Sequence, residues 1–141
     1  MPVVLVDVDQ IKQVFFNIIK NAMESMAYKK RLLISIFTDD DCVVLEFDDQ
    51  GQGIAAECMR RIFESFYTSK TNGTGLGMFI VQRILRNHGA TLSIASQKNR
   101  GTSISVKFLK KIRMLKMLET DKKQSCKLLP WRGFFKCKKF Q

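Results

Sequence analysis

The sequence is poor in the residues that build disulfide frameworks and metal centres. Its 141 residues include four cysteines, one histidine and two prolines. The cysteines, at positions 42, 58, 126 and 137, form no Cys-x-x-Cys pair, and the histidine does not stand at metal-ligand spacing from them. Neither a zinc site nor a disulfide framework is indicated, so we expect a reduced, cytoplasmic protein.

Long hydrophobic runs are also absent. No apolar stretch approaches the roughly 18 residues needed to span a bilayer, and the first four residues lack the charged and apolar regions of a signal peptide. Any membrane anchor of the intact protein is therefore expected to lie in regions missing from this chain.

Acidic residues are scarce at one end only. Residues 1–109 contain 13 Lys and Arg and 11 Asp and Glu, whereas residues 110–141 contain 11 and 2, so most of the net charge of +11 belongs to the tail. We expect one globular domain at 1–109 and a basic, poorly ordered extension at 110–141. Interleaved aromatics in the tail could bind anionic lipid weakly, but no specific nucleic-acid partner is expected.

Helical and strand patterns alternate along the domain. Asp7 and Gln10 have the spacing of a capping box, and an apolar stripe follows from Ile11 to Met26. Strand patterns occupy 3–6, 31–38, 42–49, 91–95 and 102–108, and helical patterns occupy 55–62 and 74–88. Because the strands cluster as hairpins, we expect an α+β fold, a two-layer sandwich in which helices cover one face of a mostly antiparallel sheet.

Glycines concentrate between residues 49 and 77, in two turns that flank a polar loop. Such glycines suit positive φ or close approach of a ligand to the backbone, which predicts a nucleotide site. Residues 51–56 formally fit a dinucleotide fingerprint. That fingerprint requires a second strand ending in an acidic residue about 20 residues later, and this position falls in the polar loop. The Walker pattern fails as well, since no glycine is followed by Lys and then Ser or Thr.

Four motifs occur in the order found in the ATP-binding domains of sensor histidine kinases, the Bergerat fold. Asn-Ile-Ile-Lys-Asn-Ala (17–22) resembles the N box, and Asp-Gln-Gly-Gln-Gly-Ile (49–54) resembles the first glycine box. Residues 62–70 are similar to the F box, and Gly-Thr-Gly-Leu-Gly-Met (73–78) to the second glycine box. The resemblance covers about residues 2–109 and is strongest to the sporulation and nitrogen-regulation kinases.

The resemblance implies ATP and Mg²⁺ as cofactors and assigns roles to individual residues. Asn21 would coordinate the magnesium, Asn17 would support the same polar face, and Asp49 would accept a hydrogen bond from the adenine amino group. Lys70, on the lid, would meet the γ-phosphate. The remaining positions expected to line the nucleotide are Gly51, Gly53, Ile54, Phe66, Gly73, Thr74, Gly75, Leu76, Gly77 and Thr102.

The resemblance also implies where the phosphoryl group goes. Hydrolytic relatives of the fold have a general-base Glu at the position of Asn17, and an amide cannot take a proton, so the γ-phosphoryl group is expected to pass to an outside nucleophile. In the family this is a histidine on a dimerisation domain, and a response regulator acts downstream. His88 is expected to be structural. In members of the family, another strand and helix come before the segment that matches residue 3, which implies a domain shortened at its N-terminus.

Other functions remain open from the sequence. A stand-alone serine kinase of the anti-sigma type has the same fold and needs no histidine domain. A docking module that retains a degenerate nucleotide site belongs to a different class, although the intact motifs argue against it. A basic binding protein driven by the tail is disfavoured by the near-neutral charge of residues 1–109.

Overall fold

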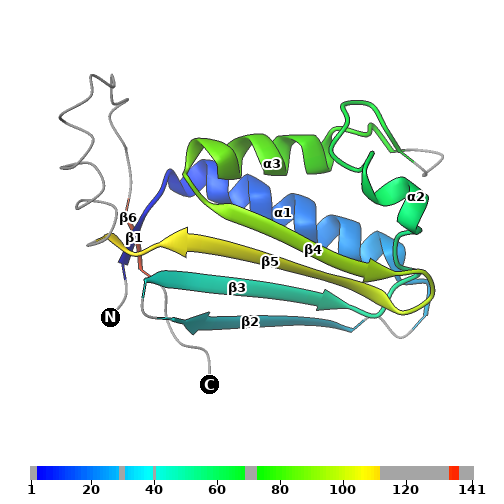
Figure 1. The fold of residues 1–141 in the computed structure, drawn as a ribbon, viewed down its shortest axis with the longest axis horizontal. Coiled ribbons are helices and arrows are strands. Elements are labelled where there is room, and N and C mark those ends of the chain that lie inside the picture. Colours follow the sequence, from blue (N-terminus) through cyan, green and yellow to red (C-terminus); the bar gives the residue numbers. More distant parts are fainter. Residues whose placement is uncertain (1–2, 29–30, 40, 69–72, 112–133, 137–141) are drawn as a thin grey trace.

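The computed structural model describes residues 3–28, 31–39, 41–68, 73–111 and 134–136. Two layers make up the domain: a sheet and, on one of its faces, the helices (Figure 1). The elements in chain order are β1 (Val3–Leu5), α1 (Val8–Ser25), β2 (Leu32–Thr38), β3 (Cys42–Asp49), α2 (Ala56–Met59), α3 (Gly77–Asn87), β4 (Thr91–Gln97), β5 (Gly101–Leu109) and β6 (Phe134–Lys136).

The main sheet has the strand order β2-β3-β5-β4, and every neighbouring pair is antiparallel. The register places apolar residues of neighbouring strands opposite one another: Leu45 pairs with Ile36 on one side and with Val106 on the other. These side chains face the helices because successive residues of a strand point to opposite faces. The expected α+β sandwich with a mostly antiparallel sheet is confirmed.

Helix α1 begins where the sequence predicts. The Asp7 side chain accepts hydrogen bonds from the backbone N–H groups of Asp9 and Gln10, and the Gln10 side chain donates to the same carboxylate at 3.1 Å. These bonds satisfy N–H groups that a helix start leaves without partners, and the backbone bonds lower the pKa of Asp7. The helix ends one residue before Met26, which is buried and closes the predicted apolar stripe.

The core lies between the helices and the sheet. Val14 and Ile18 of α1 and Val81 and Leu85 of α3 are almost completely buried, and they join the inward-facing residues of β3 and β5. Phe15 packs on Phe47 with ring centroids 5.7 Å apart. Burying a side chain of this size contributes roughly 1.5–3 kcal/mol, so this layer accounts for much of the stability.

The buried histidine joins the start of α1 to the end of α3. Nε2 of His88 accepts the backbone N–H of Asp7 at 3.0 Å, so Nδ1 carries the proton and donates to the Ile84 carbonyl at 2.7 Å. The ring is only 6% exposed. The predicted structural role of His88 is therefore confirmed.

A second, two-stranded sheet joins the two ends of the chain. Strand β6 pairs with β1 in antiparallel register, with Val4 opposite Phe135. These three residues belong to the basic extension, and no sequence pattern predicted the strand. That residues 110–141 are on the whole poorly ordered stays a prediction.

Helix bounds differ from the predictions in two places. The helix expected at 55–62 is only Ala56–Met59, and the one expected at 74–88 starts at Gly77. In both cases a turn replaces a helix end: residues 60–66 form successive turns, and the second glycine box precedes α3. No helix in the described parts of the chain is long and apolar enough to cross a membrane.

Candidate functional site

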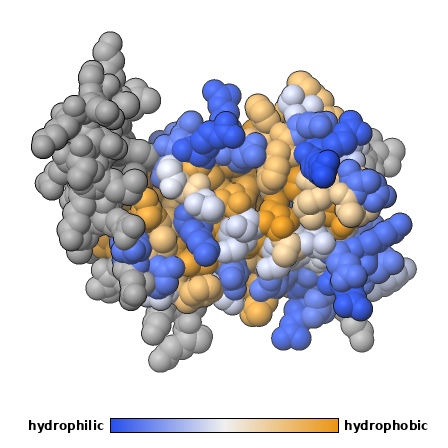
Figure 2. Space-filling model, in the orientation of Figure 1, coloured by the Kyte–Doolittle hydropathy of each residue, from blue (hydrophilic) through white to orange (hydrophobic). Residues whose placement is uncertain are grey.

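Several chain segments end at the same side of the domain. The C-terminus of α1, the N-terminus of α3, the end of β3 and the β4–β5 turn all lie at the right-hand side of Figure 1. The lower part of the same side is hydrophilic in Figure 2. Lys98 and Arg100 of the β4–β5 turn are exposed. Asn21, Asp49, Gly77 and Thr102 lie on these segments, so the fold gathers motifs separated by more than 50 residues.

The last residue of β3 carries the most constrained carboxylate. Oδ1 of Asp49 accepts the N–H groups of Gly51 at 2.8 Å and Thr102 at 3.2 Å and lies 3.4 Å from the Ser25 hydroxyl. Within the described part of the chain, no hydrogen bond reaches Oδ2. One oxygen is thus anchored, and the other remains available for a donor on a ligand.

The first glycine turn is bonded to the β4–β5 hairpin. The Ile54 N–H donates to Oγ of Ser96 at 2.8 Å, and that hydroxyl donates to the Gly101 carbonyl at 2.9 Å. Because Ser96 has a single proton, the 2.9 Å contact with Thr102 requires the Thr102 hydroxyl to be the donor. Gly53 has φ +66°, and its Cα faces the Gln97 carbonyl so closely that any side chain would collide.

The second group of polar side chains lies between α1 and α3. A Cβ on Gly77 would be 3.7 Å from the Asn21 amide nitrogen and 3.9 Å from Oδ1 of Asn17, so the first turn of α3 packs beside both. Nδ2 of Asn17 is buried without a hydrogen-bond partner. The N-cap residue of α3 is Leu76, whose apolar side chain makes no capping hydrogen bond to the first N–H groups of the helix.

This arrangement fits an anionic group with a cation beside it. A buried amide nitrogen and an uncapped helix N-terminus both offer donors, which phosphate oxygens accept. A cation needs oxygen ligands, and the side-chain oxygen of Asn21 could supply one. The described residues hold no cluster of three or more His, Cys, Asp or Glu side chains that could bind a metal ion by themselves.

The loop before α3 is fixed at its two ends. The Phe66 N–H donates to the Gly75 carbonyl at 3.0 Å, and both residues have positive φ, +66° and +68°. The Arg61 guanidinium lies 4.2 Å from the centroid of the Tyr67 ring, and a hydrogen bond with Cys58 raises the pKa of the Tyr67 hydroxyl. Phe66 itself is 74% exposed, an unusual position for a strained aromatic residue.

Lys70 lies outside the described residues, whereas Gly73 and Thr74 lead into the glycine turn. The sequence analysis did not identify Ser25 and Ser96, both of which bond to the predicted site. Ser25 could have been found, because it stands four residues after Asn21 and so shares its side of the helix. Glu24, on the same helix, pairs with Lys20 at 3.9 Å.

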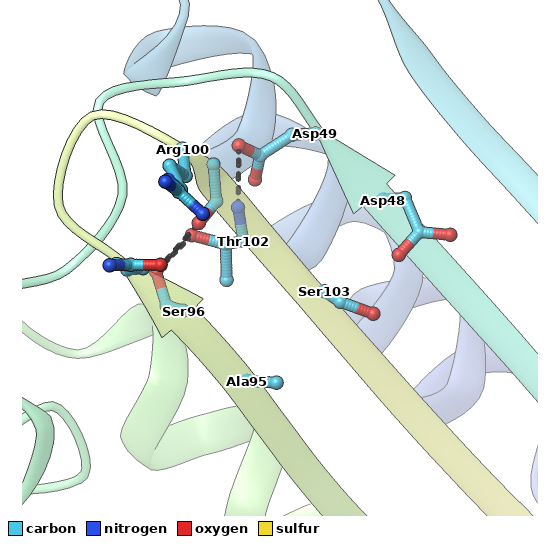
Figure 3. A pocket seen from close by; sticks show the side chains of 9 residues that line it. Asp48, Asp49, Ala95, Ser96, Arg100, Thr102 and Ser103 are labelled. Carbon is cyan, nitrogen blue, oxygen red and sulfur yellow. Dashed lines mark hydrogen bonds between the residues drawn. The ribbon is translucent and has the colours of Figure 1, made fainter.

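A shallow pocket of about 380 Å³ lies beside Asp49 at the ends of β3, β4 and β5. Figure 3 views it from the side of the sheet opposite to the helices, with Asp48 and Ser103 beside it. It shares Asp49, Ser96 and Thr102 with the site but includes neither Asn17 nor Asn21. This pocket is therefore not the place where a base and a phosphate could both be bound.

Comparison with known proteins decides the family. Residues 6–112 match the model of the histidine kinase-, DNA gyrase B- and HSP90-like ATPases. The chain belongs to this family. Sporulation kinase A of Bacillus subtilis is 40% identical over 105 residues, which cover 74% of this chain and 17% of that protein. The chain spans about a fifth of the length of the curated relatives it matches.

Solved structures of ATPases from the same family agree with the fold. A mycobacterial sensor histidine kinase, MprB, superimposes with a TM-score of 0.69 and 26% identity over 76% of this chain and 74% of the other. The catalytic domain of histidine kinase ThkA gives a TM-score of 0.66 and 30% identity over 74% and 69%. The chain is thus an ATP-binding domain of the type that sensor histidine kinases use, as the sequence motifs predicted.

Proposed function

We propose that this domain binds Mg-ATP and passes the γ-phosphoryl group to a histidine on a separate dimerisation domain of an intact sensor kinase. The observation that carries the proposal is that the polar side chains beside the N-terminus of α3 are amides. Asn17 and Asn21 lie there, next to Gly77. Amides bind phosphate and magnesium without acting as a base, which suits transfer rather than hydrolysis.

Each residue of the site would have one role in binding ATP. Oδ2 of Asp49 would accept the adenine amino group, while the donors on Oδ1 keep the carboxylate in place. The side-chain oxygen of Asn21 would bind Mg²⁺, and Nδ2 of Asn17, which lacks a partner, would donate to a phosphate oxygen. Lys70, on the lid, would neutralise the γ-phosphate. Bound magnesium would supply charge stabilisation at the phosphates.

Among the described residues, an amide, Asn17, stands at the position where a water-activating carboxylate would be needed. Glu24, the nearest carboxylate on α1, pairs with Lys20 and is 42% exposed. A general base must reach the attacking water. Glu24 lies on the same side of α1 as Asn17 and Asn21, but its carboxylate is paired with Lys20. Slow ATP turnover by the isolated chain is therefore expected.

The acceptor would have to come from outside the described residues. Both ring nitrogens of His88 are engaged in hydrogen bonds at the opposite end of α3. A histidine on the dimerisation domain, brought to the γ-phosphate by domain contact, would supply the nucleophile. A response regulator would receive the phosphoryl group afterwards. The intact kinase would be cytoplasmic or anchored through other regions.

The experiment that tests the proposal is incubation with γ-labelled ATP, with and without the dimerisation domain of an intact relative. Acid-labile label on the added domain is expected, with no label on this chain. Acid-stable label on the isolated chain would instead favour a serine kinase. Rapid release of free phosphate by the isolated chain would contradict the proposal and require a base on another residue.

A further inference from the structure

We propose that Ser25 is a positioning residue for base recognition: its hydroxyl helps to fix Oδ1 of Asp49, so that Oδ2 faces the exocyclic amino group of a 6-aminopurine. The inference deepens the proposed function and depends on Asp49 as the base-reading side chain. It assigns a role in nucleotide specificity to α1, the helix that also carries the amides at the phosphate end.

Ser25 is bonded to the base end of the site twice. Its hydroxyl lies 3.4 Å from Oδ1 of Asp49, and its backbone carbonyl accepts the Gln52 N–H at 3.1 Å. It is the last residue of α1. The C-terminus of α1 is thereby tied both to Asp49 and to the first glycine turn that follows it.

The hydroxyl also occupies the space beside the first glycine of that turn. A Cβ on Gly51 would lie only 2.1 Å from Oγ of Ser25 and 2.9 Å from Oδ1 of Asp49. Glycine at this position therefore allows the serine hydroxyl, the carboxylate and the turn to meet. No other residue type would fit without displacing one of them.

The single proton of Ser25 limits the size of the effect. Oγ also donates to the Ala22 carbonyl at 2.8 Å, a shorter contact than the one with Asp49. The proton is shared between two acceptors, and two backbone N–H groups anchor Oδ1 as well. Loss of the hydroxyl should therefore weaken ATP binding by about three- to tenfold rather than abolish it.

An anchored carboxylate discriminates between purines by charge. With Oδ1 fixed, Oδ2 is an acceptor, and it attracts the amino group of adenine while repelling the carbonyl of a 6-oxopurine. If the carboxylate could rotate, neither oxygen would stay directed at the base, and the difference in binding free energy between the two purines would fall. The contribution of Ser25 should consequently appear as a loss of preference among bases and not as a general loss of affinity.

The test compares two ligands on the full chain. Calorimetry would measure binding of ATP and of purine riboside triphosphate, which lacks the 6-amino group, to wild type, Ser25→Ala and Ser93→Ala. Ser93 is an exposed serine of β4 and serves as the matched control. Ser25→Ala should reduce the preference for ATP by about three- to tenfold, with unchanged affinity for the analogue. Ser93→Ala should change neither affinity.

Each outcome separates the inference from the proposed function. If Ser25→Ala weakens the binding of both ligands equally, or changes neither affinity, Ser25 has no role in base recognition. Asp49→Ala provides the second comparison. If that variant keeps the wild-type preference for ATP, the base does not bind at Asp49 and the proposed site is wrong. If Ser25→Ala fails to fold, Ser25→Cys, which keeps the volume and donates weakly, should show the same reduced preference.

Discussion

At the scale of single residues, the two carboxylate oxygens of Asp49 have different hydrogen-bond partners, and this difference determines the effect of replacing Asp49 by asparagine. Oδ1 accepts two backbone N–H groups, from Gly51 and Thr102. An asparagine at this position would have to place its carbonyl oxygen there, since an amide nitrogen cannot accept a hydrogen bond. Its NH₂ group would then take the place of Oδ2 and present a donor where the wild type presents an acceptor.

We therefore predict that Asp49→Asn weakens ATP and ADP binding alike, by about tenfold or more, because a charge-assisted bond worth roughly 1.5–3 kcal/mol becomes a contact between two donors. The same variant should bind inosine triphosphate better than wild type does, since its 6-carbonyl would meet the new NH₂ group. Calorimetry with the three nucleotides would measure this. An unchanged ADP affinity would remove Asp49 from the base site.

At the scale of elements, the hydrogen bond between Phe66 and Gly75, ahead of α3, depends on a glycine at position 75. Gly75 has φ +68°, and an added Cβ would lie 2.4 Å from the backbone carbon of Phe66. Gly89, after α3, has a similar φ of +61°, but nothing lies within 4 Å of its added Cβ. The two positions therefore share the cost of a left-handed backbone and differ only in the collision.

We predict that Gly75→Ala weakens ATP binding by about tenfold or more, because the Phe66–Gly75 bond that closes the loop must break. Gly89→Ala should lower the free energy of unfolding by about 1 kcal/mol and leave ATP affinity unchanged. Denaturant unfolding and calorimetry on both variants would measure this. Equal ATP affinities in the two variants would show that the loop closure is irrelevant to binding.

The capping box of α1 predicts a pH dependence. Hydrogen bonds from the Gln10 and Asp9 backbones lower the pKa of Asp7 in the folded state. A lowered folded pKa means that the stabilisation is full above the ordinary carboxyl pKa, about 3.9, and is lost as the pH falls through the folded value. Asp7→Ala should be less stable than wild type at neutral pH, and the difference should shrink on acidification below that value.

The control for this prediction is Asp9→Ala, which removes an exposed carboxylate paired with Lys12. Such surface pairs contribute little, so the control should stay close to wild type across the same pH range. Urea unfolding at several pH values would follow both variants. A constant stability difference for Asp7→Ala down to low pH would contradict the capping role of the carboxylate.

At the scale of the whole molecule, the end of the tail contributes a strand to the domain. Deleting residues 112–141 removes β6 and leaves β1 without its partner, so we predict a lower free energy of unfolding. ATP affinity should stay unchanged at temperatures where the variant is folded, because every matched motif precedes Leu109. Thermal unfolding and calorimetry would check both. Loss of ATP binding by the folded variant would show that the tail supports the site directly.

Much of this molecule could be predicted because its signals are local. The capping box at Asp7 and the period-2 pattern around Leu45 depend on neighbours in sequence, and both elements were predicted. Strand β6 was missed because pairing with β1 is a contact between the ends of the chain. The contact of Ser25 with Asp49 joins a helix to a strand 24 residues away, so only the helical spacing hinted at it.

The buried bond between His88 and Asp7 also bears on how the site could open. It joins α1 and α3 at the end remote from Asn21 and Gly77, and the helices run in opposite directions (Figure 1). That tether would act as a pivot, with α3 as a lever about 16 Å long, so a rotation of about 5° would move its first turn by about 1.4 Å. Amide hydrogen exchange should then be slow near His88 and respond to nucleotide mainly near Gly77.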